Sequence, residues 1–325
     1  MPGTDQQQNE SLVAVVVTFN RLEKLKETVA RLLESPASDL QAVLVVDNCS
    51  TDGTWDWLQA QDHPQLHVHR TEYNSGGAGG FEIGMRLADE KWNPDWMVIM
   101  DDDGRPAKGG LRAFHERKER GFDAYASAVY YPAGGICDMN RPSYNPFWHL
   151  KSFFQTAMGG GRAGFHLTDE DYDRDEGLDI DATSFVGLFI SRKAIEKTGY
   201  PDGRLFIYGD DVLYTILMRK AGCSLRFSPD IRFEHDFGTF TEEDRRFKPL
   251  WKSYYHHRNL MLVYREAAGW WFLPVLFVIL PKWLLKGLGY PGQRKPFYRL
   301  LIPAIVDGLT HRFHRKHPEI VALSE

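Results

Sequence analysis

The first part of the chain alternates short apolar runs with stretches in which apolar residues recur every three or four positions. Continuous β-branched runs such as LVAVVV predict strands that are buried on both faces of a parallel sheet. The stretch that follows places Leu25, Val29 and Leu32 at helical spacing. Strands are predicted at residues 12–20, 42–47, 66–71 and 95–103, and helices at residues 21–35, 54–61 and 74–90. This alternation predicts an α/β fold with a Rossmann-like, mostly parallel sheet flanked by helices, and ligands at the carboxyl ends of the strands.

The pattern loosens after the fourth predicted strand. Residues 130–177 are rich in Gly, aromatic and acidic residues with little periodicity. Such a stretch is typical of a lid or binding loop, although a surface insertion without function would look the same. Order returns at residues 181–199, which predict a strand and an amphipathic helix. Residues 203–222 then place two acids before a helix, and residues 224–236 predict a strand that runs into His235.

The C-terminal part contains a strongly apolar run at residues 270–288, interrupted by Pro274, Pro281 and Lys282. We expect this run to be too short and too broken for a transmembrane helix, which needs about 20 apolar residues. Trp residues within the run and basic residues within and after it suit the surface of an anionic membrane instead. These residues are Trp270, Trp271, Trp283, Lys286, Arg294, Lys295, Arg299, Arg312, Arg315 and Lys316. The alternative is a helical hairpin that packs on the first domain or on a second copy in a homo-oligomer.

Length and composition narrow the classes of function. The 325 residues suit one large domain, predicted at residues 1–245 with halves at about 12–124 and 125–245, plus an amphipathic helical appendage at residues 246–325. A net charge of −5 argues against nucleic acid as a partner. The three cysteines are widely spaced, without metal-ligand spacing or a disulfide framework, and the first twelve residues lack a signal-peptide core. We therefore expect a cytoplasmic protein that associates peripherally with the inner face of the membrane.

Three consecutive acids end the fourth predicted strand. If strand geometry continues through them, Asp101 and Asp103 point to one side and Asp102 to the other. Two carboxylates on one side can hold Mg²⁺ or Mn²⁺, which usually also bind substrate phosphates. A solvated acidic turn would have the same sequence.

A second acid pair follows the apolar run LFIY. Asp210 and Asp211 open a predicted helix, where the helix dipole favours a carboxylate, so a simple cap is the alternative reading. Two acid clusters that each follow apolar sequence nevertheless indicate a metal site plus a general base. A neutral imidazole at His235 is a candidate for a further metal ligand.

Several motifs in their joint order resemble the family 2 glycosyltransferases, which are inverting enzymes with a single GT-A domain. The motifs are VAVVVTFNR, VLVVDNCSTDGT, NSGGAGGFEIGM, MDDDG, FVGLFISRKAIEKTGYPDGRLFIYGDDVLY and FEHDFG, and they span roughly residues 12 to 240. The sequence is most similar to the bacterial galactofuranosyltransferase and rhamnosyltransferase branches. DDDG and YGDDVLY favour the galactofuranosyl branch.

The resemblance implies roles for individual residues on the donor side. Asp47 would accept a hydrogen bond from the uracil or thymine ring, and Asp102 would reach toward the nucleotide. The Gly-rich run would let backbone approach the nucleotide closely, as glycine permits. It lacks the Lys of a P-loop and the spacing of a dinucleotide fingerprint. The implied nucleotide-sugar contacts are Thr18, Phe19, Asn20, Arg21, Asp47, Asn74, Gly76, Gly77, Gly80, Asp101 and Asp102.

The same resemblance implies the catalytic, metal and acceptor residues. Asp211 matches the catalytic base, and Asp210 stands where many members have Glu. Asp101 and Asp103 match the outer acids of the DXD motif, which with His235 would hold Mn²⁺ or Mg²⁺. The predicted acceptor contacts are Phe185, Gly187 and Trp148.

The expected activity is therefore transfer of a sugar from a nucleotide-diphosphate donor to a cell-surface or lipid-linked glycan. UDP-galactofuranose is the favoured donor and dTDP-rhamnose the alternative. A sugar nucleotidyltransferase is a weaker alternative, because the segment TFNRLEKLKE is not the basic Gly-rich loop that such an enzyme would need near its N-terminus.

Overall fold

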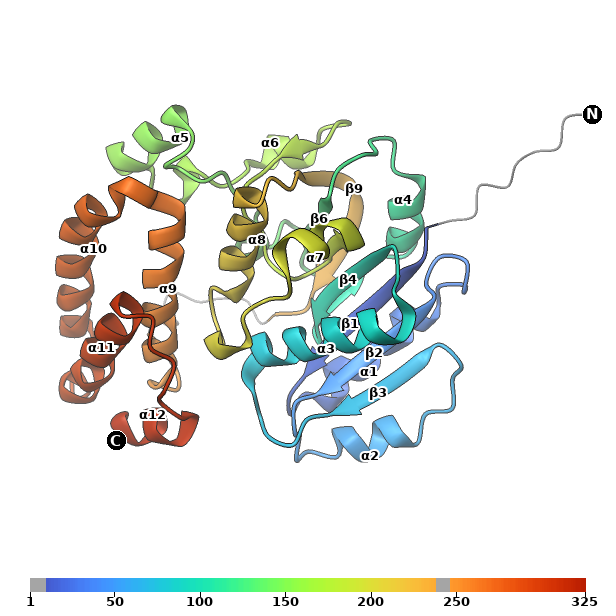
Figure 1. The fold of residues 1–325 in the computed structure, drawn as a ribbon, viewed down its shortest axis with the longest axis horizontal. Helices are drawn as coiled ribbons and strands as arrows, with labels where there is room; N and C mark the ends of the chain where they lie inside the picture. The colour runs from blue at the N-terminus through green and yellow to red at the C-terminus, as the bar shows by residue number, and fades with distance from the viewer. Residues whose placement is uncertain (1–9, 238–245) are drawn as a thin grey trace, which may run out of the picture.

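The computed structural model describes residues 10–237 and 246–325, and its centre is one nine-stranded sheet (Figure 1). The strand order is β3-β2-β1-β4-β8-β6-β9-β5, and β7 also pairs with β9. The first four strands are parallel, whereas β8 runs antiparallel to both β4 and β6. The bounds are β1 Leu12–Thr18, β2 Ala42–Asp47, β3 Leu66–Arg70, β4 Trp96–Asp101, β5 Gly104–Pro106, β6 Ala124–Tyr130, β7 Leu178–Asp179, β8 Leu188–Ser191 and β9 Leu225–His235.

Helices cover both faces of this sheet, because successive residues of a strand point to opposite faces. Val13, Val15 and Val17 of β1 lie in one buried cluster with α3, α7 and α8. Ala14 and Val16 lie in the other cluster, with α1, α2 and α4. The bounds are α1 Leu22–Leu33, α2 Thr54–Gln59, α3 Gly76–Trp92, α4 Gly110–Glu116, α7 Arg192–Thr198 and α8 Asp210–Lys220. The mostly parallel three-layer α/β fold predicted from the sequence is confirmed.

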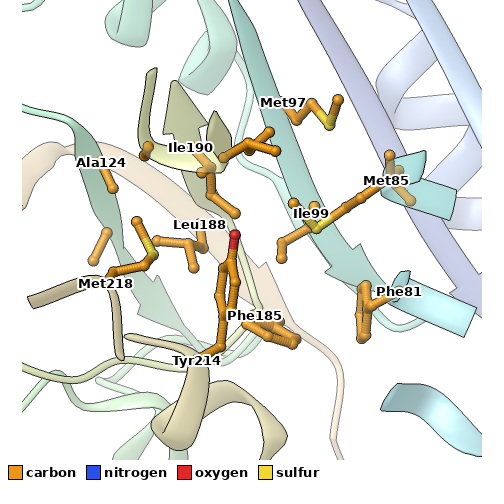
Figure 2. Close-up of a cluster of buried hydrophobic side chains, with 14 of the residues drawn as sticks. Phe81, Met85, Met97, Ile99, Ala124, Phe185, Leu188, Ile190, Tyr214 and Met218 are labelled. Carbon is orange, nitrogen blue, oxygen red and sulfur yellow. The ribbon is translucent and has the colours of Figure 1, made fainter. Parts of the chain in front are cut away.

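Figure 2 shows part of the first cluster, where aromatic and thioether side chains meet between the sheet and its helices. Phe185 packs edge-on against Phe81 of α3, with ring centroids 4.9 Å apart, and against Tyr214 of α8 at 5.9 Å. These contacts fix the positions of α3 and α8 relative to the ends of β1 and β4.

Four further helices form the C-terminal region, beside the sheet domain in Figure 1. They share a buried cluster of their own, rich in aromatic residues such as Tyr254 and Phe297. A smaller cluster joins this region to the sheet domain, since Leu262 and Val263 pack with Leu213 of α8. The bounds are α9 Lys252–Ala268, α10 Phe272–Lys286, α11 Arg294–Leu309 and α12 His317–Leu323.

The stretch after β4 holds the main differences from the sequence prediction. The strand β6 was not predicted, although it lies buried in the sheet between β8 and β9. Its sequence, AYASAVY, mixes small and aromatic residues and lacks a branched apolar run. The segment predicted as irregular carries two short helices, α5 Leu150–Gln155 and α6 Asp169–Tyr172.

Candidate active site

The two acid clusters lie at the carboxyl end of β4 and at the N-terminus of α8. β4 ends at Asp101, the next two acids form a turn, and β5 begins at Gly104. Because β5 pairs with β9 so that Gly104 lies opposite His235, the turn is brought against that histidine. The sheet therefore gathers residues that are more than one hundred positions apart in the chain.

The turn contradicts one sequence prediction. Strand alternation was expected to separate Asp102 from its neighbours, but the strand ends before Asp102. One guanidinium nitrogen of Arg21 bridges Asp102, at 3.4 Å, and Asp103. Asp102 also accepts a hydrogen bond from the Thr18 hydroxyl at 2.8 Å. Both acids thus face the same cation, and the predicted assignment of faces is wrong.

His235 lies in a buried chain of polar contacts. Its Nε2 is 3.1 Å from an Asp103 carboxylate oxygen, and its Nδ1 is 2.7 Å from the side-chain oxygen of Asn140. Burial alone would lower the pKa of His235, but the hydrogen bond and charge of Asp103 outweigh it and raise that pKa to about 10. His235 is therefore a cation in this arrangement, and it must lose its proton before it can bind a metal.

The pKa values of Asp101, Asp210 and Asp211 are raised as well. Burial, with the charges of Asp103 and Asp102, raises the pKa of Asp101 to about 7. Burial and the charge of Asp211 raise the pKa of Asp210 well above its ordinary value. Burial also raises the pKa of Asp211 to about 6, against a 2.7 Å hydrogen bond from the Val212 amide. Carboxylates gathered this closely are stabilised by a bound cation.

The site fits a divalent cation by its donor chemistry. Within the described residues, the Asp101 carboxylate has no hydrogen bond or ion pair, so its oxygens are available to a hard metal. Asp103 and His235 lie together, but Asp103 is hydrogen-bonded to His235 and is also paired with Arg21. No three His, Cys, Asp or Glu side chains of residues 10–237 and 246–325 form a ready-made metal cluster. The predicted set of Asp101, Asp103 and His235 stays a prediction.

The predicted nucleobase contact has an unsatisfied oxygen. Asp47, at the end of β2, is fully buried, and its Oδ1 accepts the Ser50 amide at 2.9 Å. Its Oδ2 has no hydrogen-bond partner and lies 3.5 Å from Nε of Arg70. A buried acceptor without a donor is costly, so a ligand N–H at this point would be stabilising. Nearby, the Phe19 ring is 41% exposed, as a ligand-facing ring would be.

Close packing explains several glycines of the Gly-rich run at residues 74–80, which the sequence alone did not reveal. α3 begins inside it, at Gly76, where φ is +74° and an added Cβ would lie 2.0 Å from the Phe206 carbonyl oxygen. A Cβ on Gly80 would lie 2.4 Å from Val17. Only Gly77 faces open space. Asn74 accepts the Gly76 amide at 2.8 Å and so shapes the turn into the helix. Nucleotide contact by these residues stays a prediction.

The predicted acceptor contacts lie in three different environments. Phe185 is 3% exposed within the core of Figure 2, and this burial does not support direct contact with an acceptor. Gly187 has a φ of +70°, and a Cβ there would clash with Ser127 and Phe233, so it is required by packing. Trp148 is 40% exposed and is the one of the three that a ligand can reach.

Three polar residues near the site were not predicted. Asn48 donates to the Gly76 carbonyl at 2.7 Å and accepts the Ser75 amide at 2.9 Å, which ties the end of β2 to α3. Asn140 supports His235 from the segment predicted as irregular. Lys252 opens α9, and burial together with the charge of Arg21 lowers its pKa. Asn48 directly follows Asp47, which is the only local signal in the sequence for any of them.

Comparison of the sequence with known proteins finds a matching family and several relatives. The family description "Glycosyl transferase family 2" matches residues 13–169. Over 294 residues the chain is 25% identical to the galactofuranosyltransferase GlfT1 of Mycolicibacterium smegmatis, covering 88% of this chain and 91% of the relative. Over 300 residues it is 25% identical to the N-acetylglucosaminyl-diphospho-decaprenol L-rhamnosyltransferase of Mycobacterium tuberculosis, covering 85% and 89%.

Solved structures share the fold at low sequence identity. The mannosyltransferase PcManGT of Pyrobaculum calidifontis, in complex with GDP-Man and Mn²⁺, has a TM-score of 0.53 at 17% identity, over 99% of this chain and 81% of that one. GalNAc-T7, with UDP, GalNAc and Mn²⁺, has a TM-score of 0.53 at 14% identity. That match covers 79% of this chain but about half, 48%, of the longer GalNAc-T7.

Proposed function

We propose that this glycosyltransferase of GT-A fold, whose residues 13–169 match the family 2 description, is a metal-dependent inverting enzyme. It transfers a sugar from a nucleotide-diphosphate donor to a hydroxyl of a lipid-linked or cell-surface glycan. The observation that carries the proposal is the position of two adjacent acids, Asp210 and Asp211, in the first turn of α8, close enough to the end of β4 for Asp210 to feel the charge of Asp101.

Asp211 is the base in this proposal. Its pKa of about 6 leaves it ionised at neutral pH yet basic enough to accept a proton, which is the range that favours general-base catalysis. It takes the proton of the acceptor hydroxyl while the new bond to the sugar C1 forms and the bond to the diphosphate breaks. Burial and the charge of Asp211 raise the pKa of Asp210 well above its ordinary value, which favours its neutral form and makes Asp211 the better candidate for this role.

Other residues bind and orient the donor. The free oxygen of Asp47 accepts from the nucleobase, and Asp102 faces the ribose. Asp101 and Asp103 would hold Mn²⁺ or Mg²⁺, which, when bound, neutralises the charge that develops on the leaving diphosphate. Arg21, already at the acid turn, adds a second positive charge there.

UDP-galactofuranose is the favoured donor, because the motifs DDDG and YGDDVLY and the match to a galactofuranosyltransferase agree. dTDP-rhamnose is the alternative, supported by the match of equal identity to a rhamnosyltransferase. A panel of nucleotide sugars, incubated with a membrane fraction as acceptor and Mn²⁺, tests the choice. Transfer from UDP-galactofuranose alone supports the first donor, transfer from dTDP-rhamnose alone supports the second, and transfer from neither contradicts the proposed substrate class.

We further propose that the C-terminal region docks on the inner face of the membrane. Apolar side chains on the outer side of α10 are uncovered, with Trp270 fully exposed and Phe277 and Val278 at 83% and 71%. The short helix α5 lies next to the start of α10, since Phe153 is 6.4 Å from Trp271 between ring centroids (Figure 1). Large apolar side chains exposed on this segment and on α10 are Leu150, Phe154, Met158, Leu273, Leu284, Leu285 and Leu288.

Docking fits the helix lengths better than spanning does. Residues Lys252–Gly289 form a helical stretch of 38 residues that, by length and composition alone, could cross a membrane, with a mean hydropathy of 1.6 over an 18-residue window. The stretch bends at Gly269, where φ is +53°, and α9 and α10 then lie side by side (Figure 1). α10 alone has 15 residues and is about 22 Å long, less than the ~30 Å of a hydrocarbon core.

Charge reversal at the edge of this surface tests the docking. Lys295 and Arg299 line an open hollow of about 650 Å³ on α11, next to α10. Replacing both by Glu is expected to reduce co-sedimentation with anionic vesicles, because each basic residue near the surface contributes ~1 kcal/mol. The matched control reverses Arg112 and Lys118, which are exposed at and just after α4 on the far side of the molecule.

Equal loss in both double variants would mean that net charge alone governs binding. Wild-type protein that does not bind vesicles but forms a dimer in solution would show that a second copy covers this surface. Retention after alkaline carbonate would instead indicate a spanning segment.

A further inference from the structure

The loop that leads into α8 has an unusual backbone. It follows the short helical turn Gly203–Leu205, and both Phe206 and Tyr208 have positive φ, +68° and +69°, before Gly209 at +74°. Residues with side chains rarely adopt this conformation, and they keep it only where surrounding contacts impose it. Because Asp210 and Asp211 follow directly, whatever holds this loop also sets where they lie.

Asn259 of α9 makes the densest contacts with the loop. It is 1% exposed, and its Nδ2 lies within hydrogen-bond distance of three carbonyl oxygens, those of Leu205 at 3.0 Å, Ile207 at 2.9 Å and Tyr208 at 2.7 Å. One amide group thus holds the loop from both sides of Phe206. Only a donor fits this position, because all the groups facing it are acceptors.

Arg258 holds the start of the same loop and orients Asn259. It is 2% exposed, and its NH2 donates to the carbonyls of Arg204 at 3.0 Å and Leu205 at 2.8 Å. Its Nε donates to the side-chain oxygen of Asn259 at 2.9 Å, which fixes the amide with its nitrogen toward the loop. A guanidinium buried this deeply and directed at backbone carbonyls serves to fix their positions.

Aromatic stacking holds the strained residue itself. The Phe206 ring stacks nearly parallel on Tyr255 of α9, with centroids 4.7 Å apart, and on His317 of α12, at 4.6 Å. The Phe206 carbonyl also accepts the Ala78 amide of α3 at 3.2 Å. The loop is therefore fixed between the C-terminal helices and the nucleotide-binding half.

We propose that Arg258 and Asn259 are positioning residues for the transfer reaction, which act by holding the loop at residues 204–208 so that Asp211 faces the acceptor hydroxyl. This inference rests on the proposed role of Asp211 as base. It assigns part of the catalytic geometry to the C-terminal region, which the sequence analysis treated as an appendage for membrane or oligomer contacts.

Replacing Asn259 by Asp tests the proposal with little change of volume. The carboxylate cannot donate to the three carbonyls and repels them, so the loop is expected to shift while α9 remains packed. Turnover at saturating donor is expected to fall about 10²-fold, since misplacement of a reacting group by about 1 Å has that effect. The affinity for UDP with Mn²⁺ is expected to stay within a few-fold of wild type, because the residues predicted to bind it lie outside the loop.

Met261→Ala is the matched control. Met261 follows Asn259 by two positions in the same helix, is fully buried, and packs against Gly308 of α11. It is expected to lower the melting temperature while leaving turnover near wild type. If Asn259→Asp does not fold, Phe206→Ala provides the second test, since it removes the stacking and leaves the contacts among α9, α10 and α11 intact.

Two outcomes would overturn the proposal. One is normal turnover in a folded Asn259→Asp protein or in Phe206→Ala. The other is loss of turnover and UDP affinity together, in step with the melting temperature and equally in Met261→Ala, which would mean a general structural role. Hydrogen exchange of the amides at residues 205–210 reports the loop directly. Faster exchange in Asn259→Asp supports the proposal that Arg258 and Asn259 hold the loop, even if Asp211→Asn remains active. Activity of Asp211→Asn would count only against the assignment of Asp211 as the base.

Discussion

Asp211→Asn is expected to lower turnover at saturating donor by about 10²- to 10⁴-fold, the range that a positioned general base contributes. The substitution keeps the shape of the side chain and removes its ability to take a proton. UDP affinity is expected to change little, because Asp211 is proposed to face the acceptor hydroxyl and not the nucleotide. Steady-state kinetics together with calorimetric titration of UDP measure the two quantities separately.

Asp210→Asn is the matched control. Because the raised pKa of Asp210 favours its neutral form, which an amide resembles, the loss of turnover is expected to be much smaller. In the wild-type enzyme, turnover is expected to fall as the pH drops through about 6, where Asp211 becomes protonated and can no longer accept a proton. A large loss in Asp210→Asn beside normal turnover in Asp211→Asn would exchange the two roles.

Removal of divalent metal is the second large effect that we expect. Chelation should lower turnover by at least about 10²-fold, since a metal bound at a leaving diphosphate contributes several kcal/mol. Mn²⁺ or Mg²⁺ should restore it. Asp101→Asn should weaken Mn²⁺-dependent UDP binding most, because the Asp101 carboxylate is not engaged by other described residues.

Asp102→Asn provides the comparison for the metal. Its oxygens already contact Thr18 and Arg21, so we expect a smaller effect on the metal dependence of binding than in Asp101→Asn. Equal effects of the two substitutions would argue that the acid turn binds the ion as a unit. Turnover that persists after chelation would contradict a metal-dependent mechanism.

The sequence predicted the parts of the fold that local patterns specify. Apolar runs and helical spacing identified β1 to β4 and the helices α1 to α3. β1, β2 and β4 are buried on both faces, β3 lies partly buried at the edge of the sheet, and the helices have one apolar side. β6 was not predicted because its burial comes from β8 and β9, which follow it much later in the chain. Strand alternation failed at Asp102 because a turn to β5 begins there, and DDDG permits either conformation.

The site could be predicted only as separate residues. The sequence motifs identified the acids and His235 as candidates. The pairing of β5 with β9 that brings Asp103 against His235 is a property of the whole sheet. Partners such as Asn140 and Asn259 carry no local signal, since an Asn in a loop or helix is usually exposed. Their roles depend on which distant backbone groups they meet.

The contacts of Arg258 and Asn259 with the loop at residues 204–208 have a consequence for the order in which the parts of the site form during synthesis. Chains are made from the N-terminus at about 5–20 residues per second, and early segments can fold before later ones exist. The strands that carry Asp47 and the acid turn, and Asp211 itself, therefore leave the ribosome before Arg258 and Asn259 do. A nascent chain at that stage has its donor-binding sequence but lacks the contacts that hold its base. On the proposal above, catalytic competence is expected to arrive last, together with the C-terminal helices that hold the loop.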